Sequence, residues 1–195
     1  MADKKIVFLD IDGTFTVPLE KPTELALRAV REARKNGHRV LISTGRNMPI
    51  VSEDVLEAGF DGIVASAGRH IEIDGKVIRD SVLPEKTIQR CLEIFHQFGI
   101  YCRIESPEGI YIDGSLQKIL MSAAAELSNS ELIRMKKELD SDVGVKPYTE
   151  YPRRGAYKLG FICTDLSALE KTKPYLEQEF HYVVHPYAKA GDCYN

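Results

Sequence analysis

The stretch IVFLDIDGT, residues 6–14, decides the fold, because an unbroken apolar run leads directly into two aspartates and a Gly-Thr turn. A short continuous run of Ile, Val, Phe and Leu is typical of a strand buried on both faces, as in parallel sheets. Side chains two apart in extended backbone lie on the same side, so Asp10 and Asp12 can converge on one point. Carboxylates held that close need a cation or a shared proton. The stretch therefore predicts a negatively charged site that binds Mg²⁺ at the tip of the first strand.

Two other interpretations of the Asp-x-Asp-Gly pattern compete with this one. The pattern is common in turns, where Asp caps backbone donors and Gly accepts a positive φ. A turn alone does not require the bulky apolar residues that precede it, so we favour it less. A calcium-binding EF-hand that starts at Asp10 needs Gly at the sixth loop position and Glu at the twelfth. The chain has Phe15 and Lys21 there, which excludes the EF-hand.

Apolar periodicity in the first 80 residues predicts strands that alternate with helices. We expect strands over 39–44 and 63–66, and helices over 23–36 and 48–58; this βαβαβ order favours a parallel sheet. The first helix is expected to bury one stripe, made of Leu25, Ala26, Ala29, Val30 and Ala33. Alternating apolar and polar residues on both sides of Asp74-Gly75 predict a β-hairpin. The fold class is therefore α/β, and residues 1–80 are expected to form the N-terminal part of a Rossmann-like parallel-sheet core.

Beyond residue 81 the pattern changes to α+β, which predicts a second domain over residues 81–195. The helices expected there cover residues 84–98, 115–127, 130–139 and 166–180. The strands expected there cover residues 99–105, 109–113, 156–163 and 182–184.

These motifs resemble those of the haloacid dehalogenase-like superfamily, whose first motif is a strand that ends in Asp-x-Asp-Gly-Thr, as at residues 10–14. The stretch RVLISTGR, residues 39–46, is similar to the second motif, with Thr44 as its hydroxyl. Its Thr-Gly-Arg ending resembles the Cof-type sugar-phosphatase branch, which carries a type C2 cap domain after this motif. VASAGRHIEIDGKVI (64–78) and YKLGFICTD (157–165) are similar to further blocks of that branch, except that Ala67-Gly68 replaces its usual Asn-Gly. The resemblance implies that residues 81–195 form the cap.

The resemblance implies a hydrolase, a phosphoric monoester phosphatase that acts on a small phosphorylated metabolite, a sugar phosphate by family frequency. Asp10 would attack phosphorus and form an aspartyl-phosphate, and Asp12 would be the general acid and base. Thr44, the Gly45 amide and Arg46 would bind the phosphoryl group. Mg²⁺ would be bound by Asp10 and by the main-chain carbonyl of Asp12. For Arg46 a surface ion pair is an equally weighted alternative.

Two further motifs of the family are not evident. A phosphate-holding Lys is expected after the cap, where Lys171 and Lys173 are candidates by distance only, and Lys158 lies in the cap-like strand. The terminal GDCYN, residues 191–195, resembles the start of the fourth motif, but no buried strand is predicted before it. In the family the first strand is central, so residues 6–9 would form an unpaired apolar edge here. We expect an N-terminal portion of a longer polypeptide, or one completed by a partner, with weak or no catalysis alone.

Composition limits the classes of partner. The 195 residues are 44% hydrophobic and 28% charged, as in water-soluble globular proteins. A net charge of −3 offers no polycationic surface for nucleic acid, and no apolar stretch is long enough for a membrane span. The N-terminus lacks the apolar core of a signal peptide. We therefore predict a cytoplasmic protein whose partner is a small phosphorylated substrate, with buried, reduced thiols at Cys91, Cys102, Cys163 and Cys193.

Two rival functions remain open. The first is a truncated or partner-completed module that binds a phosphorylated ligand without catalysis. The second is a receiver-like phospho-acceptor domain, since receivers also place acidic residues at strand tips. The predicted hairpin and second domain disfavour a receiver, which is a single compact domain.

Overall fold

The computed structural model describes residues 3–17, 20–122, 138–139, 145–163 and 165–180. Contacts within the chain define two compact units, and the chain passes from the first to the second between Val82 and Leu83. Of the described residues, the first unit contains 3–17, 20–82 and 138–139, and the second contains the others. The assignment of residues 1–80 to a catalytic core and of 81–195 to a cap stays a prediction.

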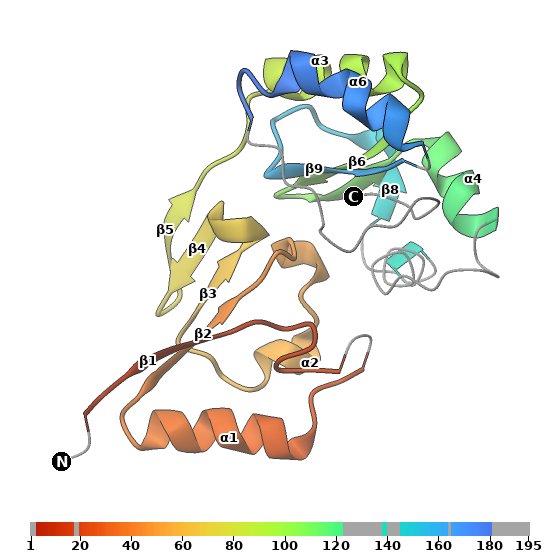
Figure 1. Ribbon diagram of the computed structural model, residues 1–195. Helices are drawn as coiled ribbons and strands as arrows, with labels where there is room; N and C mark the ends of the chain where they lie inside the picture. Colours follow the sequence, from red (N-terminus) through yellow and green to blue (C-terminus); the bar gives the residue numbers. More distant parts are fainter. Residues whose placement is uncertain (1–2, 18–19, 123–137, 140–144, 164, 181–195) are drawn as a thin grey trace. The chain divides into compact units, whose positions relative to one another are not determined.

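The first unit is built on a five-stranded sheet in the order β1-β2-β3-β4-β5 (Figure 1). The strands β1 (Ile6–Leu9), β2 (Arg39–Ser43) and β3 (Gly62–Ala65) are parallel. Strand β4 (His70–Ile73) pairs antiparallel with β3, and β5 (Lys76–Asp80) pairs antiparallel with β4. The parallel sheet and the hairpin that the sequence predicts are both confirmed.

Local residue chemistry explains where these elements turn. Asp74 and Gly75 have φ values of 52° and 71°, the left-handed pair that a two-residue hairpin turn requires. Helix α1 (Glu24–Lys35) begins after Thr23, whose hydroxyl oxygen accepts a hydrogen bond from the Ala26 amide at 3.2 Å. It ends before Gly37, whose φ of 86° is unfavourable for other residues. The two ends of α1 thus return the chain for the parallel pairing of β1 with β2, and the Asp74-Gly75 turn joins β4 to β5.

Two details of the helix predictions are wrong. Leu25 was expected in the buried stripe of α1, but it is 66% exposed, and Leu27 is buried instead, beside Val30. Residues 48–58 do not form one helix. They form a 3₁₀ turn (Met48–Ile50) and a short helix α2 (Glu53–Leu56), because Val51 is extended, with φ −81° and ψ 115°.

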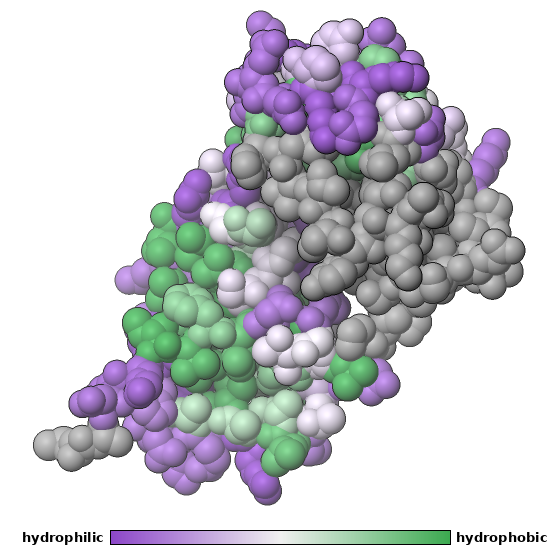
Figure 2. Space-filling view, viewed as in Figure 1, coloured by the Kyte–Doolittle hydropathy of each residue, from purple (hydrophilic) through white to green (hydrophobic). Residues whose placement is uncertain are grey.

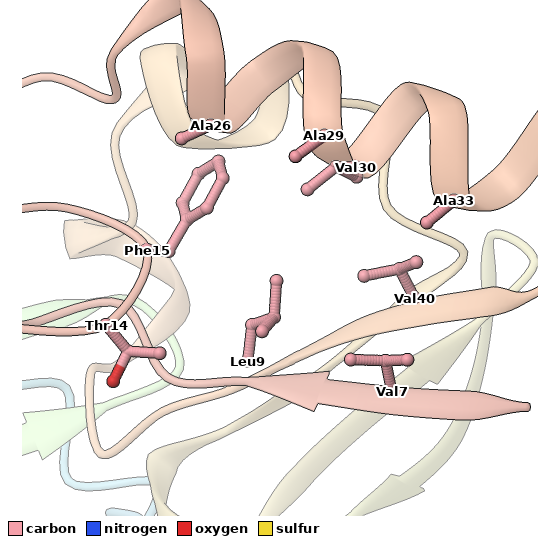
Figure 3. A pocket seen from close by; sticks show the side chains of 9 residues that line it. All are labelled: Val7, Leu9, Thr14, Phe15, Ala26, Ala29, Val30, Ala33 and Val40. Atoms are coloured by element: carbon pink, nitrogen blue, oxygen red, sulfur yellow. The ribbon is translucent and has the colours of Figure 1, made fainter.

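Strand β1 lies at the edge of the sheet and pairs with β2 in the described part of the chain. Ile6 and Phe8 are 63% and 57% exposed, whereas Val7 and Leu9 point toward α1 (Figure 3). Figure 2 shows hydrophobic residues gathered over the sheet of this unit. The unpaired apolar edge that the sequence predicts is therefore present among the described residues.

An open apolar groove separates α1 from β1 (Figure 3). Its volume is about 250 Å³. The side chains from α1 are mostly alanines, too short to fill the space above the strand. The lining residues are Val7, Leu9, Thr14, Phe15, Ala26, Ala29, Val30, Ala33 and Val40. This edge of the sheet is thus covered on one side only loosely by α1.

Asp61, just before β3, links three elements of the first unit. Its carboxylate accepts hydrogen bonds from Arg34 of α1 at 3.0 Å and from the Val40 amide of β2 at 2.8 Å. Its carbonyl oxygen accepts a hydrogen bond from Asp74 in the hairpin turn. Burial raises the pKa of Asp61, but these hydrogen bonds and the arginine charges outweigh burial, so the pKa lies below its ordinary value.

The second unit is a four-stranded sheet with helices on one face (Figure 1). The strand order is β8 (Val145–Pro147), β7 (Gly109–Ile112), β6 (Tyr101–Ser106), β9 (Lys158–Ile162). Helices α3 (Glu85–Gln97) and α6 (Leu166–Leu176) pack on the sheet through a core that includes Ile88, Leu92, Phe95, Ile104 and Leu169. Helix α4 (Gly114–Ser122) follows β7.

Most predicted elements of this unit are confirmed, and three fall outside what the structure describes. The helices expected over 84–98 and 166–180 and the strands over 99–105, 109–113 and 156–163 are present, with shifted ends. Strand β8 was not predicted. The second half of the helix 115–127, most of the helix 130–139 and the strand 182–184 lie outside the described residues.

The described cysteines behave as the sequence predicts. Cys91, Cys102 and Cys163 are buried and free of disulfides, and burial raises the pKa of each thiol. Cys193 lies outside the described residues. Among the helices that the structure describes, none has the length and apolar character needed to cross a membrane.

Gly62 should be intolerant of any side chain, because β4 passes too close. A Cβ atom there would lie 2.5 Å from the carbonyl oxygen of Glu72 and 3.1 Å from the Cα of Ile73. Gly62→Ala is therefore expected to lower the free energy of unfolding by about 1 to 3 kcal/mol. The matched control is Gly114→Ala, where a Cβ meets nothing within 4 Å, and no loss is expected. Urea unfolding of both variants measures this, and equal stabilities would contradict the described packing of β3 on β4.

Asp61→Asn should remove stability that depends on pH. Because the pKa of Asp61 is lowered in the folded state, its carboxylate stabilises the fold above the pKa of the unfolded chain, about 4. The variant should lose about 1 to 2 kcal/mol at pH 7, and its difference from the unchanged chain should shrink as the pH falls below about 4. Asp54→Asn is the control, because the Lys21–Asp54 pair is exposed. A pH-independent difference would contradict the role of the charge.

Candidate active site

The candidate site lies where β1 and β2 end. In the parallel register Leu9 faces Ile42, so Asp10 follows β1 at the level where β2 ends in Ser43, and Thr44 comes next. Ligands of open α/β sheets bind at the carboxyl ends of such strands. The structure thus brings the first motif, Asp10 and Asp12, to the same edge as Thr44, Gly45 and Arg46.

Apolar anchors hold the turn that carries the two aspartates. Ile11 is fully buried, and Phe15 packs edge-on against Phe60 with ring centroids 5.2 Å apart. The backbone closes on itself, since the amides of Phe15 and Thr16 donate to the carbonyl oxygen of Ile11 at 3.2 and 2.9 Å. Because neighbouring side chains point in opposite directions, burial of Ile11 turns the flanking aspartates outward. Asp10 is accordingly exposed, and Asp12 is half-buried.

Arg46 binds Asp12 through two parallel hydrogen bonds. Its Nε lies 2.9 Å from Oδ2 and its Nη2 lies 2.6 Å from Oδ1 of Asp12. The arginine side chain is 15% exposed and the carboxylate 33%. Such a bidentate, charge-assisted pair is stronger and more directional than a single contact. Arg46 thus forms an ion pair, although inside the site and not at the surface as one of its two interpretations expected, and binding of a phosphoryl group by Arg46 stays a prediction.

The turn after β3, residues 66–68, forms hydrogen bonds to the second motif, residues 39–46, and we call this contact the β3 brace. The Ser66 amide donates to the carbonyl oxygen of Arg46 at 2.8 Å, and the Ala67 amide donates to that of Thr44 at 3.2 Å. This turn requires left-handed backbone at three successive residues, with φ values of 50°, 53° and 85° for Ser66, Ala67 and Gly68. Sequence reasoning missed this brace, because Ser and Ala are not residues that favour positive φ.

The hydroxyl of Thr44 is held in a defined orientation. Its Oγ1 accepts a hydrogen bond from the Arg46 amide at 3.1 Å, and the residue is only 5% exposed. The Thr44 amide is in turn paired with the carbonyl oxygen of Val64 on β3. Since the oxygen already accepts, its hydrogen is the part left for a ligand. The Gly45 residue beside it is exposed, and a Cβ there would meet nothing within 4 Å.

The oxygen atoms near Asp10 suit a magnesium ion. The Asp10 carboxylate is exposed, and the carbonyl oxygen of Asp12 accepts no hydrogen bond from the described part of the chain. Mg²⁺ prefers such hard oxygen ligands, often one or two carboxylates completed by water. The described residues contain no group of three or more His, Cys, Asp or Glu side chains placed to hold a metal. The residues present therefore fit a magnesium ion bound by Asp10 and the Asp12 carbonyl, rather than a three-ligand side-chain centre.

The candidate lysines all lie in the second unit. Lys158 on β9 pairs with Glu105 at 3.2 Å, and Lys173 on α6 pairs with Glu170. Lys171 is exposed on the same helix. None of these positions identifies a phosphate-holding lysine, and the terminal GDCYN lies outside the described residues.

Ala67 offers a test of the β3 brace. A left-handed backbone is unfavourable for a residue other than glycine by about 1 to 2 kcal/mol. Replacement by glycine removes this strain, but glycine loses more backbone entropy on folding, which cancels part of the gain. Ala67→Gly should therefore raise the free energy of unfolding by about 0.5 to 1 kcal/mol. The control is Ala65→Gly, which removes a fully buried methyl group from ordinary extended backbone and should destabilise. If thermal unfolding shows that both variants are destabilised alike, the strained turn is not present in solution.

Comparison with known proteins gives a consistent family. A family profile described as haloacid dehalogenase-like hydrolase matches residues 7–194. The curated protein "Putative phosphatase YkrA" of Bacillus subtilis (strain 168) is 32% identical over 91 residues, which are 47% of this chain and 35% of that protein. A "Putative phosphatase" of Haemophilus influenzae is 24% identical over 180 residues, which are 88% of this chain and 60% of that protein.

Solved structures show the same fold. A phosphatase of the haloalkanoate (HAD) superfamily from Bacteroides thetaiotaomicron, BT1666, superposes with a TM-score of 0.66 at 21% identity, over 89% of this chain and 60% of that chain. A protein from Geobacillus kaustophilus gives a TM-score of 0.69 at 22% identity, over 98% and 68%. The sugar phosphatase BT4131 gives 0.63 at 18% identity, over 90% and 64%.

The chain spans 35% and 60% of the lengths of the two curated relatives that it matches. The family profile nevertheless covers almost all of it, from Val7 to Tyr194. This chain therefore belongs to the haloacid dehalogenase-like hydrolases.

Proposed function

We propose that this chain carries the nucleophile and the general acid of a Mg²⁺-dependent phosphatase that hydrolyses a small phosphorylated metabolite. The observation that carries the proposal is the arrangement at the ends of β1 and β2. There Asp10, whose carboxylate is exposed, lies two residues before Asp12, whose carboxylate is held by Arg46. Two neighbouring acids in different environments suit the separate roles of nucleophile and proton donor.

The proposed reaction has two steps. In the first, an oxygen of Asp10 attacks phosphorus, the bond between phosphorus and the leaving oxygen breaks, and Asp12 gives that oxygen a proton. The product alcohol leaves and Asp10 carries an acyl phosphate. In the second, Asp12 takes a proton from water, the water oxygen attacks phosphorus, and the bond to Asp10 breaks. Inorganic phosphate leaves, Asp10 is again an ionised carboxylate, and Asp12 is again the protonated acid with which the first step began.

The remaining site residues would stabilise the phosphoryl group. The Thr44 hydroxyl, whose oxygen is occupied by the Arg46 amide, has its hydrogen available for a phosphoryl oxygen. The exposed Gly45 leaves room for a phosphoryl group beside its backbone. The Asp10 carboxylate and the Asp12 carbonyl oxygen would hold Mg²⁺, which would supply positive charge against the repulsion between Asp10 and the phosphate.

The substrate class is proposed from relatives and the compartment from the thiols. Both curated relatives are named as phosphatases, and the structural relative BT4131 is described as a sugar phosphatase. We therefore propose a sugar phosphate as the substrate. Free, buried thiols at the described cysteines support a cytoplasmic protein.

A non-catalytic module that binds a phosphorylated ligand is the second candidate. It is favoured by the lack, among the described residues, of a group of three metal-ligating side chains. It predicts binding of inorganic phosphate without turnover of p-nitrophenyl phosphate, which separates it from the phosphatase.

Asp10→Asn should abolish turnover. The amide cannot attack phosphorus, so kcat with p-nitrophenyl phosphate and Mg²⁺ should fall at least about 1,000-fold. Circular dichroism should stay unchanged, because Asp10 is exposed. The control is Asp54→Asn, an exposed carboxylate paired with Lys21, which should keep its activity.

Three outcomes distinguish the functions. Loss of activity only in Asp10→Asn, with a phosphorylated protein trapped by rapid quench in the unchanged chain, supports the phosphatase. Stoichiometric phosphorylation without turnover supports a receiver-like phospho-acceptor. Undiminished turnover by Asp10→Asn would refute the nucleophile.

A further inference from the structure

We propose that Arg46 is a positioning residue that holds the Asp12 carboxylate for proton transfer, instead of a ligand of the substrate phosphate. This inference rests on the proposed function, because it assigns the orientation of the general acid in that reaction. It differs from both roles that the sequence leaves open for Arg46, a phosphate ligand and a surface ion pair.

The geometry of the pair leaves Asp12 able to react. Each carboxylate oxygen accepts one N–H from Arg46, at 2.9 and 2.6 Å. A carboxylate has about four lone-pair positions, so each oxygen keeps one that Arg46 does not use. The planar fork fixes the plane of the carboxylate as well as its distance. Arg46 therefore selects one orientation of Asp12 while an oxygen remains free to carry the proton.

Arg46 is itself held by its surroundings. Its amide donates to Thr44 Oγ1 at 3.1 Å, and its carbonyl oxygen accepts from the Ser66 amide at 2.8 Å. Its Nη1 also approaches the carbonyl oxygen of Ile50 at 3.4 Å. With 15% of its side chain exposed, the guanidinium is fixed before any substrate binds. The conformational entropy of a long side chain is thus already lost on folding, and little is lost on binding substrate.

The same contacts argue against a phosphate-binding role. Arginine has five N–H donors, and three of them are directed at Asp12 and Ile50. If the guanidinium of Arg46 bound a phosphate through Nε and Nη2, it would have to leave Asp12. That exchange leaves a half-buried carboxylate without its charged partner, which is unfavourable.

A surface pair in the same unit shows the contrast. Arg39 and Asp74 also make a short contact, at 2.6 Å, but their side chains are 43% and 60% exposed. Only one oxygen of Asp74 takes part in that hydrogen bond. Exposed ion pairs of this kind contribute little to stability and do not hold their side chains in one geometry. Arg39→Lys is therefore a matched control for Arg46→Lys.

The role has a kinetic consequence that a phosphate ligand would not have. A leaving group that forms a stable anion, such as p-nitrophenolate, needs little protonation. Phenolate is a poorer leaving group and depends more on the general acid. Loss of orientation at Asp12 should therefore slow the hydrolysis of phenyl phosphate more than that of p-nitrophenyl phosphate, although both substrates carry the same phosphate group.

The test is steady-state kinetics of Arg46→Lys on these two substrates, with Mg²⁺, in the full chain. Lysine keeps the charge but lacks the planar fork. We expect kcat to fall about tenfold more for phenyl phosphate than for p-nitrophenyl phosphate. KM and the inhibition constant of inorganic phosphate should change less than about threefold. Asp12→Asn should show the same selectivity, and the double variant should show no further change in it, since the two residues act as a unit.

Other results would overturn the inference. A rise of KM and of the phosphate inhibition constant, with the ratio of the two kcat values unchanged, would make Arg46 a phosphate ligand. Equal losses on both substrates that add to those of Asp12→Asn would make it a structural residue only. A selectivity change in Arg39→Lys would show that the readout is not specific. Absence of turnover by the unchanged chain would refute the proposed function itself, before any variant is compared.

Discussion

The parallel pairing of β1 with β2 is the constraint on which the site depends. The register that places Leu9 beside Ile42 is what brings the loops after both strands to one edge. A slip of one residue would turn every side chain of β1 to the opposite face, moving Val7 and Leu9 away from α1. The Asp12 carboxylate would then no longer face Arg46. Hydrophobic alternation against the helix and the chemistry at the strand tip are therefore two consequences of one register.

The charged pair works because apolar and backbone contacts hold both of its members. On one side Ile11 and Phe15 are buried and orient the turn that carries Asp12. On the other side the backbone of Arg46 is tied to the strained turn after β3. Left-handed backbone at Ala67 is unfavourable by itself, and the hydrogen bonds of that turn to the second motif offset it. The site is thus assembled from three strand ends, of which the sequence reveals only two.

The features that could be predicted from the sequence are those that neighbouring residues determine. The Asp74-Gly75 turn, the Thr23 cap and the apolar run before Asp10 are local features, and each leads to the observed element. The error at Leu25 has a different cause: periodicity marks an apolar stripe on α1 but not which side of it β1 and β2 cover. The bidentate contact between Asp12 and Arg46 joins residues 34 apart, so no local pattern predicts it.

The open edge of β1 restricts what can lie beside it. One face of this edge carries the exposed side chains of Ile6 and Phe8, and the other face lines the apolar groove beside α1. Any strand that pairs with β1 there must therefore present apolar side chains on both of its faces. Such a strand would run beside Asp10 on the side away from Thr44. Residues at its end would then approach Asp10 from the side opposite Thr44. The apolar surface that the described residues leave uncovered therefore borders the same strand tip that carries Asp10.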